Sequence, residues 1–88
     1  MPRGQSIGEV THFFSKIQVI VVKMGKGDLA VGDKIRIHGK STDFTQTVRS
    51  MQIESVDVRS ARSGQLIGLK VEREAKVGDK VYKLVVKE

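Results

Sequence analysis

The chain has 88 residues, a net charge of +6 and no cysteine. A chain of this length forms one domain with one small core, which disfavours an active site deep in a cleft between lobes. The lack of cysteine excludes a disulfide framework and a thiolate metal site. The longest apolar run, Val19-Ile20-Val21-Val22, is too short to span a bilayer, and the N-terminus lacks the apolar stretch of a signal peptide. We therefore expect a soluble, cytoplasmic protein without a membrane partner.

The basic residues are spread along the whole chain. Lysine and arginine together number 16, and 10 acidic residues lie among them. The net charge leaves room for a polyanionic partner such as RNA. An interspersed pattern, however, is more typical of a solubilising surface than of a docking groove.

Short strand patterns alternate with turns, and no stretch of the chain carries the apolar stripe of a helix. The expected strands are residues 7–14, 17–22, 34–38, 44–53, 56–58, 67–71 and 81–86. The second of these is expected to make apolar contacts on both faces. Leu29 and Val31 are expected to fill one end of the fold, and residues 61–64 to form a turn.

Apolar residues at alternate strand positions define the expected core. Its members are Val10, Val21, Ile35, Ile37, Val48, Ile53, Ile67, Leu69, Val71 and Val81. In the first strand, Ile7 and one of Phe13 and Phe14 are expected to join them. Within 44–53 the apolar positions change parity, which indicates a bulge or a sharp bend.

One short motif occurs twice, as Val31-Gly32-Asp33-Lys34-Ile35 and as Val77-Gly78-Asp79-Lys80-Val81. Glycine adopts a positive φ without steric cost, and an aspartate side chain can bond to the backbone just beyond it. We expect two equivalent turns, each of which begins a strand. Turn stabilisation also explains Asp33 and Asp79 better than a catalytic pair of carboxylates does.

Six or seven short strands without helices predict an all-β fold, either a small closed barrel or a sandwich. Closure is the better choice, because a small open sheet would present long unpaired edges. We expect a flexible N-terminus over residues 1–6 and a single β-barrel domain over residues 7–86.

The order of strands and turns from about Ile7 to Leu84 resembles the second domain of translation GTPases such as elongation factor Tu and initiation factor two. The most specific part is Ser63-Gly64-Gln65-Leu66-Ile67-Gly68-Leu69. A closer resemblance is to the barrel at the C-terminus of collagenase-like peptidases, carried by residues 42–48 and 50–54. The resemblance implies a closed six-stranded Greek-key barrel of the translation-factor domain 2 type.

In elongation factor Tu, this type of barrel helps to hold the terminal adenosine of aminoacylated tRNA. The acid and the arginine of that pocket correspond to Gln52 and Ser55 here, and the strand on its other side corresponds to 15–20, which lacks the family's glycines. The adenosine pocket is therefore not retained in this form. The chain also has no Gly-x-x-x-x-Gly-Lys-Ser/Thr phosphate loop.

Other candidate sites have simpler explanations. His12 and His38 are the only histidines, and neither has further ligands at metal-binding spacing. The Gly-rich turn at 24–28 follows a strand but opens no helix, so it lacks the amides that bind phosphate. The hydroxyls within 41–47 have no suggestive base near them. We expect no enzyme, no metal and no cofactor.

Two functions remain. The first is a non-enzymatic, RNA-associated or translation-related binding module, whose partner would be tRNA or rRNA. The second is a protein-interaction module that docks on a larger partner, such as a collagenase-like peptidase. The oligomeric state stays open.

The basic residues that favour RNA are Lys34, Arg36, Arg49, Arg59, Arg62 and Lys70. Three phenylalanines could stack on bases, but the core is the better place for Phe13, Phe14 and Phe44. A glycine within a strand leaves backbone open to a ligand, and basic residues near it could supply charge. The expected nucleic-acid site is therefore Arg49, Gln52, Gly68 and Lys70.

Overall fold

The computed structural model describes residues 5–84, which form ten β-strands and no helix. The strands are β1 Gln5–Phe14, β2 Val19–Met24, β3 Asp28–Ala30, β4 Lys34–His38, β5 Asp43–Thr47, β6 Met51–Ile53, β7 Val56–Val58, β8 Ser60–Arg62, β9 Leu66–Lys70 and β10 Lys80–Leu84. Across these residues no helix is long and apolar enough to cross a membrane.

The expected N-terminal segment and the expected last strand both include residues outside the described range. Most of the expected flexible N-terminus lies there, although Gln5 and Ser6 already belong to β1. Residues 85 and 86, at the end of the last expected strand, also lie outside it. The domain boundaries therefore stay a prediction.

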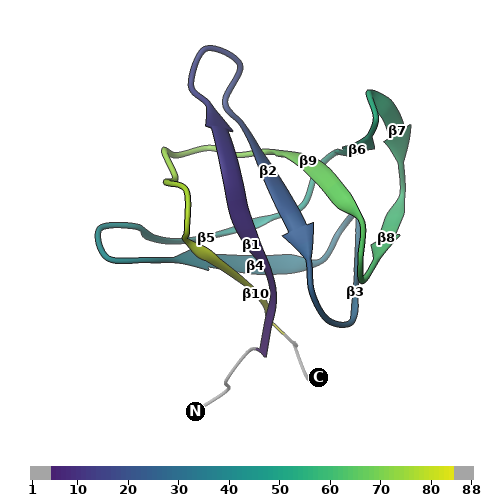
Figure 1. The fold of residues 1–88 in the computed structure, drawn as a ribbon, viewed down its shortest axis with the longest axis horizontal. Helices are drawn as coiled ribbons and strands as arrows, with labels where there is room; N and C mark the ends of the chain where they lie inside the picture. The colour runs from purple at the N-terminus through teal and green to yellow at the C-terminus, as the bar shows by residue number, and fades with distance from the viewer. Residues whose placement is uncertain (1–4, 85–88) are drawn as a thin grey trace.

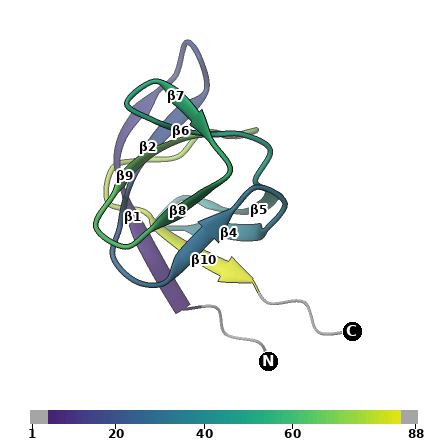
Figure 2. The same cartoon turned by 90° about the vertical axis from the view of Figure 1, so that its right-hand side faces the viewer.

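Eight strands form one curled antiparallel sheet in the order β5-β4-β10-β1-β2-β9-β6-β7, and β3 pairs with β8 in a second sheet (Figure 1). The all-β prediction is confirmed. The closed six-stranded barrel is wrong, since the larger sheet has eight strands and curls like half a barrel (Figure 2). The β6–β7 hairpin extends this sheet at one end, while β8 leaves it to pair with β3.

The expected strand over 44–53 is in fact two strands in different parts of the sheet. The first, β5, lies at one edge, whereas β6 lies next to the opposite edge. The change of parity in the sequence therefore marks a complete break at residues 48–50. The expected turn at 61–64 is also wrong in part, because residues 60–62 form β8 and the turn begins at Ser63.

Inward-facing and outward-facing residues alternate along the strands, and the inward-facing ones form the core. In β4 and β9 the second and fourth residues are buried, while the first and last are exposed. The prediction is confirmed for the buried residues Val10, Ile35, Ile37, Val48, Ile67, Leu69, Val71 and Val81. Ile53 is partly buried and packs against this core.

Val21 is not a core residue. Its side chain is half-exposed, whereas Ile20 and Val22 on either side of it are fully buried. The four consecutive apolar residues of 19–22 contain no alternation that could fix which of them face inward. The strand carries apolar side chains on both faces, with Ile20 and Val22 in the core and Val19 and Val21 on the outer face.

Two irregularities in β1 explain its inward-facing residues. The pairing register shifts between Ser6 and Gly8 opposite β10, and again between Val10 and His12 opposite β2. Each bulge reverses the alternation of the residues that follow. Ile7 and Val10 are consequently both buried and Phe13 packs against the core, but Phe14 is 48% exposed and is not a core residue.

The two Gly-Asp turns have the same geometry. Gly32 has a φ of 101° and Gly78 a φ of 97°, as the motif predicts. The aspartate side chains bond to backbone that precedes them in the chain, and not to backbone beyond them as expected. The Asp33 carboxylate accepts from the Ala30 amide at 2.9 Å, and the Asp79 carboxylate accepts from the Lys76 amide at 2.8 Å. Each side chain thus closes its own turn.

Each turn also holds a valine from a distant part of the chain. The amide of Gly32 donates to the Val48 carbonyl, and the Val48 amide donates to the Asp33 carbonyl, both at 2.8 Å. Val10 makes the same pair of bonds with the second turn, again at 2.8 Å. Both copies of the motif therefore make the same pair of tertiary hydrogen bonds to a distant valine.

Candidate docking groove

A groove of about 570 Å³ lies on the outer face of β1, β2, β9 and β6. Its floor is formed by outward-facing residues of β2 and β9, and it is bordered by the β1–β2 turn and the β6–β7 turn. We call it the apolar groove, after the partly or largely exposed side chains of Phe14, Ile17, Val19, Val21, Ile53 and Leu66 that line it.

Strand pairing brings these residues together in rows across the sheet. Residues opposite each other on adjacent strands project from the same face, about 5 Å apart. Two such rows cross this face, namely Gln52–Gly68–Val21 and Lys70–Val19–Phe14, and all of these residues except Lys70 line the groove. Beside them on β1, the ring of His12 stacks on that of Phe14 with the ring centroids 5.9 Å apart.

Large apolar side chains are unusually exposed here. Phe14 is 48% exposed, Ile17 58% and Leu66 55%, and all three line the same groove. Removing apolar surface from water contributes roughly 25 cal/mol per Å². A contiguous exposed apolar surface of this kind marks an interaction site more often than scattered single residues do.

The two turns that border the groove hold strained backbone. Among the described residues, the non-glycine positions with positive φ are Gln18 at 55°, Glu54 at 51° and Ser55 at 68°. Glu54 and Ser55 form the two-residue connection of the β6–β7 hairpin, where positive φ at both positions normally selects Asn-Gly. Such residues cost of order 1 kcal/mol each and concentrate at functional sites.

Gly68 opens the floor of the groove without being required by the fold. It lies in the middle of β9, and a Cβ placed on it would be 3.6 Å from Val19 Cγ1 and 3.9 Å from the Gln52 carbonyl oxygen. These are ordinary van der Waals distances, and Gly68 does not have a positive φ. A side chain would fit here, and it would fill the floor of the groove.

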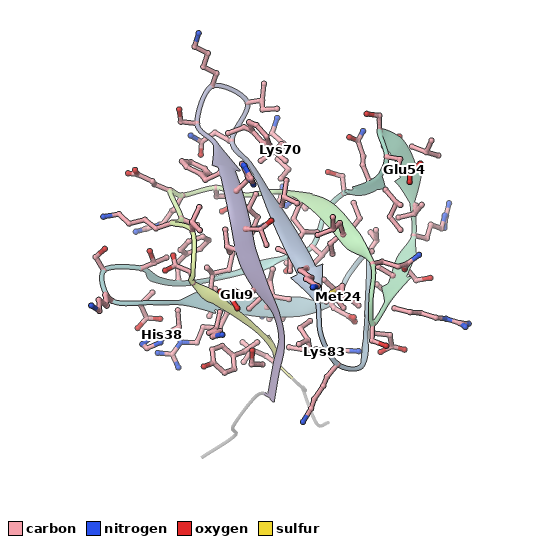
Figure 3. All side chains as sticks on the ribbon, viewed as in Figure 1. Glu9, Met24, His38, Glu54, Lys70 and Lys83 are labelled. Atoms are coloured by element: carbon pink, nitrogen blue, oxygen red, sulfur yellow. The ribbon has the colours of Figure 1, made fainter. Side chains whose placement is uncertain are left out.

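The structure brings together three of the four residues of the expected nucleic-acid site. Gln52 and Gly68 are paired in the groove, and Lys70 is the next outward-facing residue of β9, close to the β1–β2 turn (Figure 3). Arg49 does not line the groove, and its guanidinium lies 3.7 Å from the carboxylate of Glu72. The sequence places Gln52, Gly68 and Lys70 on one face, but it does not indicate that this face is apolar.

The charge of the groove does not suit a polyanion. Among the described residues that line the groove, only the acidic Glu54, on the β6–β7 hairpin, is charged (Figure 3). Another residue of the expected basic set, Arg36, donates to both carboxylate oxygens of Asp43 at 2.8 and 2.9 Å. Within residues 5–84 there is also no cluster of three or more potential metal ligands.

Sequence reasoning missed Phe14, Ile17 and Leu66. Phe14 was assigned to the core because the bulges in β1 were not visible in the sequence. Ile17 lies in the turn before β2, which begins at Val19 and not at residue 17. The usable signal was the alternation of 66–70, whose outward positions include the exposed Leu66.

Comparison with known proteins relates the chain to peptidases. No family model matches it. It is 39% identical over 83 residues to an uncharacterized protease of Methanocaldococcus jannaschii and 30% identical over 99 residues to a collagenase of Porphyromonas gingivalis. These alignments cover 93% and 91% of this chain. They span only 20% and 27% of the length of the two relatives.

The solved structures that it matches are domains of comparable size. The C-terminal domain of a candidate U32 peptidase of Geobacillus thermoleovorans superposes with a TM-score of 0.84 at 21% identity, over 90% of this chain and 99% of that one. A second crystal structure of the same domain gives a TM-score of 0.82.

These findings correct the function expected first. Sequence relatives and structural matches are proteases, a collagenase and a peptidase domain, so the RNA-associated, translation-factor-like module is wrong. The alternative, a module that docks on a collagenase-like peptidase, agrees better with them. The chain therefore has the fold of a U32 peptidase C-terminal domain, and its sequence relatives are proteases.

Proposed function

We propose that this chain acts as a non-catalytic docking domain of a collagenase-like peptidase, and that its apolar groove binds the larger part of that enzyme. The observation that carries the proposal is the groove itself, in which Phe14, Ile17 and Leu66 remain exposed on a concave face. A partner that covers these side chains would remove apolar surface from water.

The lengths of the relatives support a partner of this kind. Because the matching segment makes up 20% to 27% of each curated relative, most of every relative is available to meet such a groove. Contacts between domains of one protein commonly bury 600–1,500 Å² in order of magnitude. A face spanning four strands and two turns is large enough to take part in such a contact.

The groove offers binding groups more readily than hydrolytic ones. Its polar side chains are the amides of Gln52 and Gln65, the hydroxyl of Ser55 and the carboxylate of Glu54. A serine nucleophile needs a base that a third group holds in place. The Gln52 amide instead donates to the carboxylate of Asp57, on the neighbouring strand, at 2.9 Å. We therefore assign binding, not peptide hydrolysis, to this domain.

The proposal is tested by binding in trans. The probe is the collagenase-like peptidase of the source organism, expressed without the segment that matches this chain and titrated calorimetrically with the wild-type domain. We expect saturable binding, weakened at least about tenfold by Leu66→Lys, which places a charge in the groove. Gly68→Val should weaken it similarly, because the added side chain fills the floor.

Val77→Lys is the matched control. Val77 is 67% exposed but does not line the groove, so this variant should bind like the wild type. Thermal unfolding of every variant establishes that it is folded. Absence of binding by the wild-type domain, or full binding by folded Leu66→Lys, contradicts the proposal.

A further inference from the structure

We infer that the docking surface extends beyond the apolar groove into an adjoining basic pocket, and that its partner is an apolar protein segment flanked by carboxylates. This inference rests on the proposed function and specifies the chemistry of the partner. Three observations support it: the presence of the pocket, its continuity with the groove, and the excess of lysines that line the pocket.

The basic pocket is a hollow of about 730 Å³ over the outer face of β10, β1 and β2. Its charged lining residues are Lys23, Lys26, Lys80 and Glu9. Three lysines against one glutamate leave the hollow with an excess of positive charge.

Strand pairing joins the pocket to the groove without a gap. Glu9 on β1 is paired with Lys80 on β10 and with Lys23 on β2. Lys23 is in turn paired with Leu66 on β9, one of the exposed residues of the apolar groove. The same outward face of β2 thus presents Val19, Val21 and then Lys23. A ligand that lies along β2 passes directly from apolar to basic contacts.

The lysines differ in their existing partners. Lys80 donates to the Glu9 carboxylate at 3.1 Å, so this acid is already engaged. Among the ion pairs of residues 5–84, none includes Lys23 or Lys26. Hydrogen bonds between an ammonium and a carboxylate are about twice as strong as neutral ones, and complementary charge also orients a docking partner. Lys23 and Lys26 are therefore the groups that would receive the partner's carboxylates.

The lysines fix the direction of the partner along β2, because Lys23 lies near one end of the strand while Val19 and Val21 precede it. Glu54 borders the groove on the β6–β7 hairpin, across the sheet from β2, and disfavours an acid on that side. From Val19 to Lys23 the strand advances about 13 Å, at roughly 3.3 Å per residue. An extended segment of about five residues spans this length, with its acidic end over the lysines.

A charge-matched pair of variants tests the inference in the same titration. Lys23→Gln/Lys26→Gln removes two charges from the basic pocket, whereas Lys34→Gln/Lys40→Gln removes two exposed charges that line neither surface. At low salt we expect about tenfold weaker binding of the peptidase probe by the first variant and less than about twofold weakening by the second. The difference should shrink as salt is raised, because exposed charges are then screened.

The outcomes separate this inference from the proposed function. If Leu66→Lys weakens binding but Lys23→Gln/Lys26→Gln does not, the groove is a docking site and the basic extension is wrong. If the two lysine pairs have equal effects, the charge acts non-specifically and the extension is also wrong. If neither Leu66→Lys nor the pocket variant changes binding, both proposals fail. Binding of a single-stranded RNA oligonucleotide that depends on Lys23 and Lys26, without binding of the peptidase, would overturn the inference in favour of a nucleic acid.

Discussion

Individual glycines in this chain serve different physical purposes. At Gly32 and Gly78 the backbone has a positive φ, and an added Cβ would meet nothing within 4 Å. At Gly39 the obstacle is steric, because a Cβ would overlap the carboxylate of Asp79. That carboxylate is buried and accepts the amide of Lys76 in the second Gly-Asp turn. The sequence shows the first purpose through the repeated motif but gives no sign of the second.

This distinction predicts unequal costs for the same substitution. Gly32→Ala should lower the free energy of unfolding by about 1 kcal/mol, the cost of placing a side chain at positive φ. Gly39→Ala should cost more, at least about 2 kcal/mol, since it displaces a buried carboxylate from its hydrogen bond. Urea unfolding followed by circular dichroism measures both values. Equal costs would mean that the Asp79 carboxylate moves aside freely.

Strain at the rim of the groove gives a prediction of opposite sign. Ser55→Gly should raise the free energy of unfolding by about 0.5–1 kcal/mol, because glycine adopts the φ of 68° without steric cost. Ser50→Gly is the control, since Ser50 is exposed and is not among the positive-φ residues. It should leave stability unchanged or lower it. A loss of stability in Ser55→Gly would show that the serine side chain contributes more than the strain costs.

At the scale of elements, the sequence predicts strands well where alternation is regular and poorly where it is interrupted. The strand at 34–38 has the predicted bounds, because Ile35 and Ile37 alternate with polar residues. The break at 48–50 was interpreted as a bulge within one strand, since a change of parity looks the same in both cases. What decides between them is tertiary: Val48 bonds to the distant first Gly-Asp turn.

The ion pair between β4 and β5 predicts a pH dependence. The hydrogen bond from Arg36 is the main reason why the pKa of the Asp43 carboxyl lies below its usual 3.8, with the positive charge of Arg36 adding to it. A lowered carboxyl pKa stabilises the fold above the unfolded-state pKa, and this contribution is lost as the pH falls through the lowered value. Both side chains are largely exposed, so the effect should be small.

Asp43→Asn tests this dependence. The variant should be slightly less stable than the wild type near pH 7, and the difference should shrink as the pH falls below about 4. Thermal unfolding at several pH values measures it. A constant difference across this range would mean that Asp43 stabilises β5 through something other than its charge.

For the molecule as a whole, the sequence indicates that Gln52 and Gly68 lie on adjacent strands, but not the character of the face around them. Gln52 and Gly68 are paired, as expected, although the strand that carries Gln52 is the short β6 and not one long strand over 44–53. The apolar lining was missed because it depends on the bulges of β1 and on the start of β2, which assign Phe14 and Val21 to the outer face. The face from which a side chain projects depends on the register of its strand, so one bulge moves every residue beyond it to the opposite face.

The curled sheet leaves an open side, which the β3–β8 pair covers. Leu29 of β3 is paired with Ala61 of β8, and both are buried in the same core as the large sheet. Leu29 is fully buried in this core, whereas Val31, which was expected to fill the same end of the fold, is 42% exposed. The two-stranded sheet therefore supplies core contacts that a closed barrel would draw from its own strands.

Leu29→Ala and Val31→Ala separate the two roles within one short segment. Leu29→Ala should lower the free energy of unfolding by about 2–5 kcal/mol, because it leaves a cavity in the core formed by residues 5–84. Val31→Ala should change it by less than about 0.5 kcal/mol, as is usual for an exposed position. Urea unfolding monitored by circular dichroism gives both values, provided that each transition is two-state. If Leu29→Ala cost no more than Val31→Ala, the β3–β8 pair would be a surface attachment and the large sheet would hold its core alone.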